Sequence, residues 1–410
     1  MSTWGTIEPT ESLQTRLRLD FGLRPAILAL NDWAVPGLGG VFFVRQLTWS
    51  CLGIRLAGEL DRPAMAARIA EGIEALASWT ALGCGGYEKD DRVQGKRKLR
   101  RQDGLSFNAV SVGGAYVTVP FRRAATSALP GLGFCMTGQP RFNALQLAPP
   151  GLALAETVLR DTRIAERLRN WVMKPDTFIK NSSEQLKHAL LPSSATARER
   201  QLVSAQLMAD ANRARIVNLL QPLDTELSPL RTKQGIAAFL RQVNEPVHRA
   251  RLDACFAFEQ TRASALKAAQ TLADSIGEIP RSWSTLANAP DVQLVFDRLQ
   301  RDCETLAARL DKLSDLPADI RFFCNEHVQT TDLERRIRAL ATRVPQVFTV
   351  SQQELDRGMG YTATLIAAEP TDPSEDGVSL DALPVPRPLL RLKRLYNEIQ
   401  GSNHHDALSP

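Results

Sequence analysis

The segment DVQLVFDRLQRDCETLAARLDKLS, residues 291–314, has the clearest periodic pattern in the chain. Its apolar side chains are spaced alternately by four and three residues, at Val292, Phe296, Leu299, Cys303, Leu306, Leu310 and Leu313. This spacing keeps one face of an α-helix apolar over three heptads, as in a coiled coil or a bundle of long helices. The segment therefore predicts a mainly helical fold for the region around it.

The sequence from residue 173 onward extends this helical character. Ala, Leu, Arg, Glu and Gln run between prolines, and only 7 of the 25 glycines lie in residues 151–410. Prolines mark the ends of helices because they disrupt a helix interior. We predict helices at about 196–221, 231–243, 246–276, 291–314 and 318–343, packed antiparallel in a coiled-coil-like bundle.

The first third of the chain predicts a more mixed, α+β region. A helix at about 41–57 is apolar nearly all round and so should be buried, and a second runs from Asp61 to Gly83. A third begins at Thr118, with Phe121 and Leu129 inward and Arg122 and Arg123 available outward. Residues 134–136 and 141–147 predict a β-hairpin around the turn TGQP, and a helix follows at about 150–171.

Positive charge is concentrated in this same region. The net charge is +5, and residues 1–150 carry 17 Lys and Arg against 12 Asp and Glu, whereas residues 151–410 carry 33 of each. The densest stretch is KRKLRR, with the basic residues Lys96, Arg97, Lys98, Arg100 and Arg101, in a segment at 83–104 that predicts an exposed loop or hairpin. Such density can neutralise several phosphates of DNA or RNA. Because acidic residues flank it, a solvated surface or a contact with an acidic protein remains the alternative.

One local motif points to a known family. Leu147, Pro149, Gly151, Leu154 and Ala155 form an L-x-P-x-G-x-x-L-A pattern. This pattern resembles the corner between the wing and the following helix in winged helix-turn-helix DNA-binding proteins, and the resemblance covers about residues 115–171. Such families usually place Thr where this chain has Ala148. The resemblance implies a recognition helix at 119–130 and a wing at 133–147, with Arg122, Arg123 and Arg141 facing nucleic acid.

The sequence carries no motif of a known catalytic or cofactor site. No phosphate-loop, dinucleotide-binding, G-x-S-x-G or H-E-x-x-H pattern occurs, so we predict no catalytic residue, cofactor or metal, with an enzyme of unrecognised site as the alternative. Cys324 and His327 make half a metal site, which Cys303 or Cys255 would have to complete. The six cysteines lie singly, as in cytoplasmic proteins, and no apolar run approaches the length of a membrane span.

These observations predict three regions. Residues 1–172 form the basic, glycine-rich, winged-helix-like region, residues 173–345 the helical bundle, and residues 346–410 a mixed C-terminal region. The last of these contains a strand or two, an acidic, proline-rich linker at 369–386, and a short amphipathic basic helix at 388–399. That helix is expected either to fold back on the chain or to bind a partner.

The preferred hypothesis is a non-enzymatic subunit that binds nucleic acid, DNA rather than RNA, and assembles with itself or other proteins through its helical region. Such a two-part architecture suits an accessory subunit of a bacterial antiviral defence system, a mobile element or a regulatory complex. The alternative is a scaffold or adaptor of a multisubunit assembly that makes no nucleic-acid contact.

Overall fold

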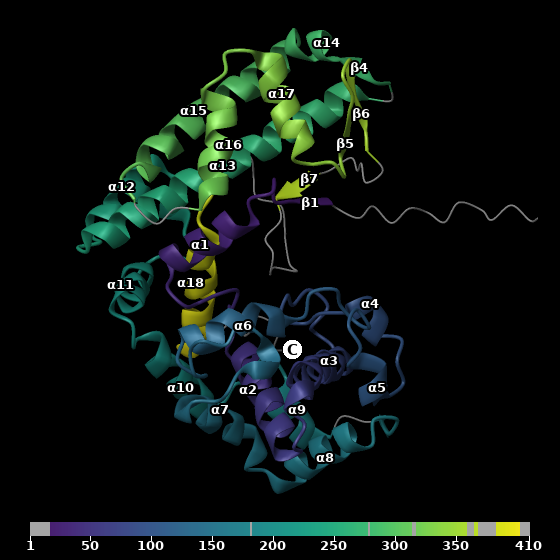
Figure 1. Ribbon diagram of the computed structural model, residues 1–410. Helices are drawn as coiled ribbons and strands as arrows, with labels where there is room; N and C mark the ends of the chain where they lie inside the picture. The colour runs from purple at the N-terminus through teal and green to yellow at the C-terminus, as the bar shows by residue number, and fades with distance from the viewer. Residues whose placement is uncertain are drawn as a thin grey trace, which may run out of the picture. The chain divides into compact units, whose positions relative to one another are not determined.

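The computed structural model of the chain describes residues 17–180, 183–277, 279–313, 317–358, 365–367 and 383–401. The described chain is mainly helical, with small sheets of two or three strands (Figure 1). It divides into two compact units. Among the described residues, unit 1 holds 17–29, 253–358, 365–367 and 383–384, and unit 2 holds 30–252 and 385–401. This division differs from the expected boundaries at 172 and 345, and it falls within two continuous helices, α1 (Arg24–Ala34) and α13 (Pro246–Ile276).

Unit 2 is built around α2 (Val44–Glu59), which is buried on nearly every side and packs against α3 (Ala66–Cys84) and α7 (Pro149–Leu159) (Figure 1). Strands β2 (Leu105–Ser106) and β3 (Phe178–Ile179) pair antiparallel. The other helices of the unit are η1 (Pro63–Met65), α4 (Lys96–Leu99), α5 (Phe107–Val110), α6 (Phe121–Gly131), η2 (Phe142–Ala144), α8 (Thr162–Met173), α9 (Glu184–Leu190), α10 (Ala197–Leu207), α11 (Ala211–Leu220), η3 (Ser228–Arg231), α12 (Lys233–Arg241) and α18 (Arg387–Ile399).

Unit 1 confirms the periodic segment as a helix with a buried seam. Six of the seven apolar residues lie in α15 (Pro290–Leu310), and all six are buried. The helix packs against α16 (Ala318–Val328) and is accompanied by α14 (Trp283–Ala287) and α17 (Leu333–Thr342). Strands β4 (Arg281–Ser282), β6 (Glu354–Arg357) and β5 (Phe348–Val350) form an antiparallel sheet in that order, and β1 (Leu17–Leu19) pairs parallel with β7 (Leu365–Ala367).

Three helices that the sequence predicts as continuous are each two helices. The segment at 150–171 is α7 and α8, the segment at 196–221 is α10 and α11, and the segment at 318–343 is α16 and α17. At each break an aspartate, Asp161, Asp210 or Asp332, accepts hydrogen bonds from backbone amides of the helix that follows. Aspartate at this position restarts a helix because its carboxylate satisfies amides that have no partner within the helix.

The expected β-hairpin at 134–147 is reduced to one antiparallel bridge between Cys135 and Leu147. Residues Phe142–Ala144, which the sequence places in the second strand, form η2 instead. The segment at 83–104 is likewise only partly exposed, because Val93 and Leu99 are buried and residues 96–99 form the helical turn α4. The structure therefore contains the helix that follows the proposed wing without a two-stranded wing.

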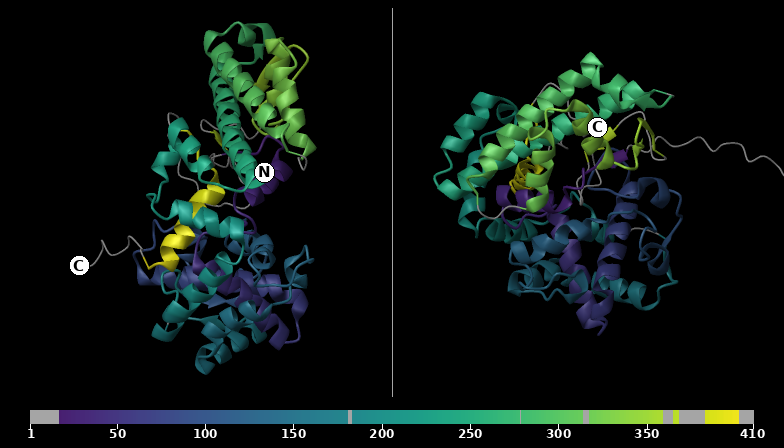
Figure 2. Two further views of the ribbon diagram at one scale, coloured as in Figure 1. Left: turned by 90° about the vertical axis from the view of Figure 1, so that its left-hand side faces the viewer. Right: turned by 45° about the horizontal axis from the view of Figure 1, so that its top comes forward.

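The C-terminal helix predicted at 388–399 is present as α18, and it folds back onto unit 2. Figure 2 shows it beside α10 and α11, and Leu389, Leu392 and Leu395 are fully buried there. The linker expected at 369–386 lies, except for residues 383–386, outside the described residues.

Helices α2 and α3 cross so closely that the crossing requires a glycine. A Cβ atom placed at Gly53 would lie 2.5 Å from the Cβ of Ala70 and 2.6 Å from its backbone nitrogen. No real Cβ approaches backbone atoms so closely, so any side chain at residue 53 would push the helices apart.

We therefore expect Gly53→Ala to lower the free energy of unfolding by roughly 1–3 kcal/mol through overpacking. Gly58→Ala in the same helix is the matched control, since nothing lies within 4 Å of its Cβ position. It should stabilise the protein by about 0.5–1 kcal/mol, because alanine favours the helix. Urea denaturation followed by tryptophan fluorescence measures the free energy of unfolding of each variant. Equal changes in Gly53→Ala and Gly58→Ala would contradict the tight crossing.

Candidate nucleic-acid interface

The segment KRKLRR is fixed to the C-terminal half of α3. Leu99 is 2% exposed and anchors α4 in the core. On either side of α4, the amide of Gln94 donates to the Ser78 hydroxyl at 3.3 Å, and Nε1 of Trp79 donates to the carbonyl of Gln102 at 2.9 Å. These contacts hold a short charged segment in a defined place on the surface.

Of the five basic residues in the segment, four are exposed, and they are Arg97, Lys98, Arg100 and Arg101. Lys96 is half-buried, donates to the Glu88 carbonyl at 2.9 Å, and burial lowers its pKa. Lys98 donates to the Gly114 carbonyl at 2.8 Å. Arg100 makes an ion pair with Glu88 at 3.6 Å, in which both side chains are more than half exposed, so its contribution is small.

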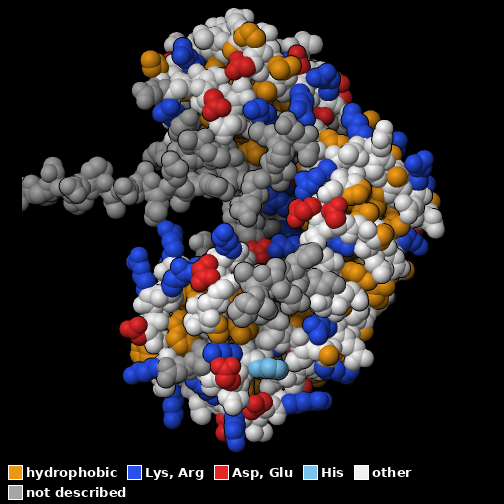
Figure 3. All heavy atoms as spheres, turned by 180° about the vertical axis from the view of Figure 1, so that it is seen from behind, with side chains coloured by type: hydrophobic (Ala, Val, Ile, Leu, Met, Phe, Trp, Pro, Cys, Tyr) orange, Lys and Arg blue, Asp and Glu red, His pale blue; other side chains and the backbone are white. Residues whose placement is uncertain are grey.

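Arg97 and Arg101 make no ion pair with any residue that the structure describes. Figure 3 shows Lys and Arg side chains gathered at the left-hand edge of unit 2, which is the side on which α4 lies. This edge therefore presents cations that the protein itself does not neutralise.

A further cation joins this surface from a distant part of the sequence. Strand β3 pairs with β2 so that Ile179 lies opposite Leu105. The next residue, Lys180, is exposed, and its Cγ would lie 3.3 Å from a Cβ placed at Gly104. We call Arg97, Lys98, Arg100, Arg101 and Lys180 the basic cluster. No spacing in the sequence connects Lys180 with the other four, because only the strand pairing brings it there.

Arg122, in contrast, lies against α3. Its Nε donates to Oε2 of Glu71 at 2.9 Å, and the guanidinium lies 5.9 Å from the centre of the Phe142 ring. The Arg122 side chain is 18% exposed and that of Glu71 is 3% exposed. The expectation that Arg122 points outward is therefore wrong, because the buried carboxylate of Glu71 requires a positive partner.

Arg123 and Arg141 are exposed, but the structure does not bring Arg141 to the basic cluster. Two residues after Arg141, Asn143 accepts a hydrogen bond from the Ala67 amide, at the N-terminal end of α3. The basic segment contacts α3 at Ser78. At 1.5 Å per residue, these two contacts are about 16 Å apart along the helix. Any nucleic-acid contact of Arg123 and Arg141 remains a prediction from the winged-helix resemblance.

Helix α3 also carries a buried acid. Glu74, on α3, is 1% exposed and accepts a hydrogen bond from the hydroxyl of Tyr116 at 3.0 Å. Burial raises the pKa of Glu74 to about 8, opposed by the Tyr116 hydrogen bond and by Arg122. Glu74 is therefore largely protonated at neutral pH. Being sealed from solvent, it is a structural group.

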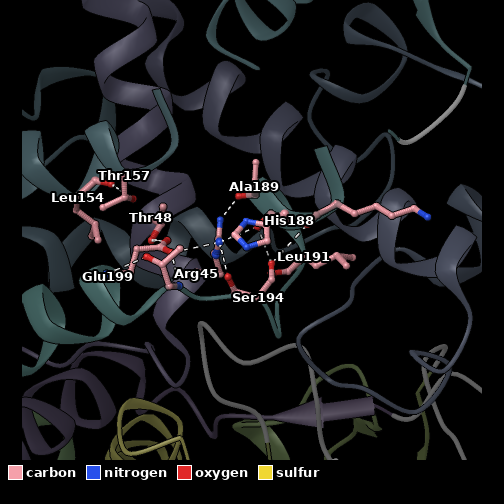
Figure 4. Close-up of polar contacts among 11 residues, drawn as sticks. Arg45, Thr48, Leu154, Thr157, His188, Ala189, Leu191, Ser194 and Glu199 are labelled. Atoms are coloured by element: carbon pink, nitrogen blue, oxygen red, sulfur yellow. Dashed lines mark hydrogen bonds and ion pairs between the residues drawn. The ribbon is translucent and has the colours of Figure 1, made fainter. Parts of the chain in front are cut away.

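A buried polar network of unit 2 surrounds Arg45 of α2 (Figure 4). Arg45 makes an ion pair with Glu199 at 3.2 Å, with side chains 1% and 0% exposed. The Arg45 guanidinium also donates to the carbonyls of His188 at 3.1 Å, Ser194 at 2.7 Å and Ala189. Thr48 donates to Glu199 at 2.8 Å. This network joins α2 to α9 and α10. Because its charged side chains are fully buried, it does not offer a ligand site.

The half metal site considered from the sequence is not completed. His327 is fully buried and packs edge-on against Phe323, with ring centroids 5.0 Å apart. Burial and the nearby Arg343 and Arg336 lower the pKa of His327 to about 3, so the ring is neutral. Among the described residues, His, Cys, Asp and Glu side chains nowhere gather in threes as metal ligands.

Comparison with protein-family models, curated proteins and solved structures finds no match to this chain. Across the described ranges, every helix is too short or too polar to cross a lipid bilayer. Function is therefore inferred from the surface chemistry of the chain itself.

Arg122→Ala should lower the free energy of unfolding by roughly 3 kcal/mol, because it leaves Glu71 buried without its partner. The adjacent Arg123→Ala removes an exposed arginine and should change stability by no more than about 0.5 kcal/mol. Chemical denaturation measures both. A stable Arg122→Ala protein would show that Glu71 does not depend on this ion pair.

The raised pKa of Glu74 predicts that stability is lost as the pH rises from about 4.5 to about 8. Between its ordinary value of 4.5 and about 8, the folded protein keeps a proton that the unfolded chain releases. The free energy of unfolding therefore falls as pH rises through this range. Glu74→Gln cannot titrate and still accepts from Tyr116, so it should flatten the decline.

Melting temperatures at pH 5.5 and 8.5 test this expectation. Burial also raises the pKa of Glu398, to about 7, so part of the decline should persist in Glu74→Gln. Glu184→Gln, at a carboxylate 84% exposed, is the control and should melt with the pH dependence of the unaltered protein. An unchanged decline in Glu74→Gln would exclude Glu74 as its source.

Proposed function

We propose that the protein is a non-enzymatic nucleic-acid-binding subunit that contacts the phosphate backbone of duplex DNA through the basic cluster. The observation that carries this proposal is the position of Lys180 beside Gly104, three residues after Arg101, where it adds a fifth exposed cation to the four of the segment KRKLRR. Lys and Arg side chains that neutralise phosphates release counterions and so bind polyanions without regard to sequence.

The surroundings of the cluster favour a duplex over a single strand. Proteins that hold single strands stack the bases on aromatic side chains. Of the aromatic residues near the cluster in sequence, Phe107 is buried, and Tyr87 is half-buried with its hydroxyl hydrogen-bonded to Ser193. Phe178, two residues before Lys180, is 56% exposed. A single exposed phenylalanine offers little to stack a row of successive bases, so this cationic surface suits the regular phosphate rows of a double helix better.

The wider setting is proposed by analogy with proteins that share this two-part architecture. We propose that the helical region mediates assembly with itself or with other proteins, and that the protein works in the cytoplasm as an accessory subunit. A bacterial antiviral defence, mobile-element or regulatory complex suits such a subunit. The winged-helix-like segment at about 115–171 would add Arg123 and Arg141 as a second contact with the duplex.

The test combines four substitutions, Arg97→Gln, Arg100→Gln, Arg101→Gln and Lys180→Gln. Lys96 and Lys98 are left unaltered, because their amino groups hold backbone carbonyls of the segment. We expect affinity for a duplex oligonucleotide to fall. The slope of log affinity against log salt should decrease by about 0.9 for each phosphate that the variant no longer neutralises. Fluorescence anisotropy at several salt concentrations measures both quantities.

A control variant removes the same charge elsewhere on unit 2. Arg160, Lys233, Arg241 and Arg249 are exposed, and their replacement by Gln should leave the salt slope almost unchanged. If both variants lost the same affinity, binding would depend on the net charge of the protein and not on the basic cluster. No binding by the unaltered protein at low salt would refute the proposal and favour an acidic protein as the partner of the cluster.

A further inference from the structure

The C-terminal helix α18 is held in unit 2 by polar contacts as well as by its leucines. Lys393 is 4% exposed, and its ammonium donates to the carbonyls of Leu220 at 3.1 Å and Gln221 at 3.0 Å. These carbonyls lie at the C-terminus of α11, where the helix leaves acceptors without partners. The docked position of α18 is therefore specified by directional bonds.

Two charged residues of α18 contact the chain that leads into α4. Arg394 forms an ion pair with Asp91, and its guanidinium lies 4.8 Å from the centre of the Phe42 ring. Glu398 lies 3.7 Å from Arg92 and also accepts a hydrogen bond from the Val44 amide at 2.9 Å. Residues 91 and 92 are thus each held by an ion pair with a residue of α18.

This contact matters for the basic cluster because residues 90–95 lead directly into the cationic segment. Arg92 makes its ion pair with Asp90, at 2.7 Å, and Asp91 acts on Arg92 only as one of the weaker charges that raise the pKa of Arg92. The ion pair of Asp91 is with Arg394. The carboxylates of Asp90 and Asp91 both act on the Lys96 ammonium and raise its pKa against the effect of burial. An uncompensated Asp91 would repel the phosphates that the neighbouring cations attract.

We propose that Arg394 is a positioning residue of the basic cluster. It neutralises Asp91 and holds the chain before α4, so that docked α18 keeps the cluster in its phosphate-binding form and displacement of α18 weakens binding. The inference rests on the proposed function for its effect on affinity. The ordering of residues 93–100 by α18 is independent of that function.

A double-mutant cycle in the full-length chain tests the electrostatic part. Arg394→Ala should weaken binding of a duplex oligonucleotide about twofold to fivefold, the range of an exposed charge pair. In an Asp91→Asn background the same substitution should have no effect, because no carboxylate remains to be neutralised. Arg394→Lys keeps the charge and should bind nearly as well as the unaltered protein.

The same variants exclude a purely structural role. If Arg394 acted only by packing on Phe42, Arg394→Ala would weaken binding equally with Asp or Asn at residue 91, and that result would overturn the proposal. Asn397→Ala is the matched control on α18, since it removes only a 3.3 Å hydrogen bond to Thr225 and should leave affinity unchanged.

Hydrogen exchange in the absence of nucleic acid separates this inference from the proposed function. Arg394→Ala should speed exchange of the amides of Val93, Lys98, Leu99 and Arg100, each of which is bonded to a backbone carbonyl at residues 90–96. If exchange became faster but neither the unaltered protein nor any variant bound nucleic acid, the proposed function would be refuted. The ordering of residues 93–100 by α18 would still be supported. Unchanged exchange would refute the coupling, whatever the affinity.

Discussion

The buried ion pair between Arg45 and Glu199 is the interaction on which the arrangement of unit 2 depends. Removing two charges from water is unfavourable unless hydrogen bonds replace the displaced solvent. Arg45 donates to the carbonyls of His188, in the last turn of α9, and Ser194, which follows that helix. Glu199 accepts from the Thr48 hydroxyl and the Thr196 amide. The pair therefore fixes α2 against a helix that lies 154 residues further along the sequence.

Charged groups continue from this pair toward the surface. Burial lowers the pKa of Arg45, and the negative charge of Glu398 opposes this effect. Glu398 also lies 3.7 Å from Arg92 and accepts a hydrogen bond from the Val44 amide, the first of α2. Arg92 in turn pairs with Asp90, a few residues before the basic cluster. The core, α18 and the base of the cationic segment thus share one set of buried and half-buried charges. In this arrangement, the position of the C-terminal helix bears directly on the surface that we propose for phosphate binding.

Much of the fold and part of the candidate site could be predicted from sequence. Apolar spacings of three and four residues located α2, α15 and α18, and composition with flanking prolines located α13. These signals missed the breaks at Asp161, Asp210 and Asp332, since an amphipathic pattern continues through a break when both helices bury the same side. At the site, the density of KRKLRR was evident, whereas Lys180 and the inward direction of Arg122 were not.

By itself the sequence determined that the chain is mainly helical and that its excess positive charge lies in the first 150 residues, because periodicity and charge density are local properties. The partner of each charge depended on the tertiary structure. Strand pairing brought Lys180 to the cluster, Glu71 drew Arg122 inward, and α18 placed Arg394 beside Asp91. Which cations remain available to a phosphate follows from packing between distant segments, which spacing along the chain does not encode.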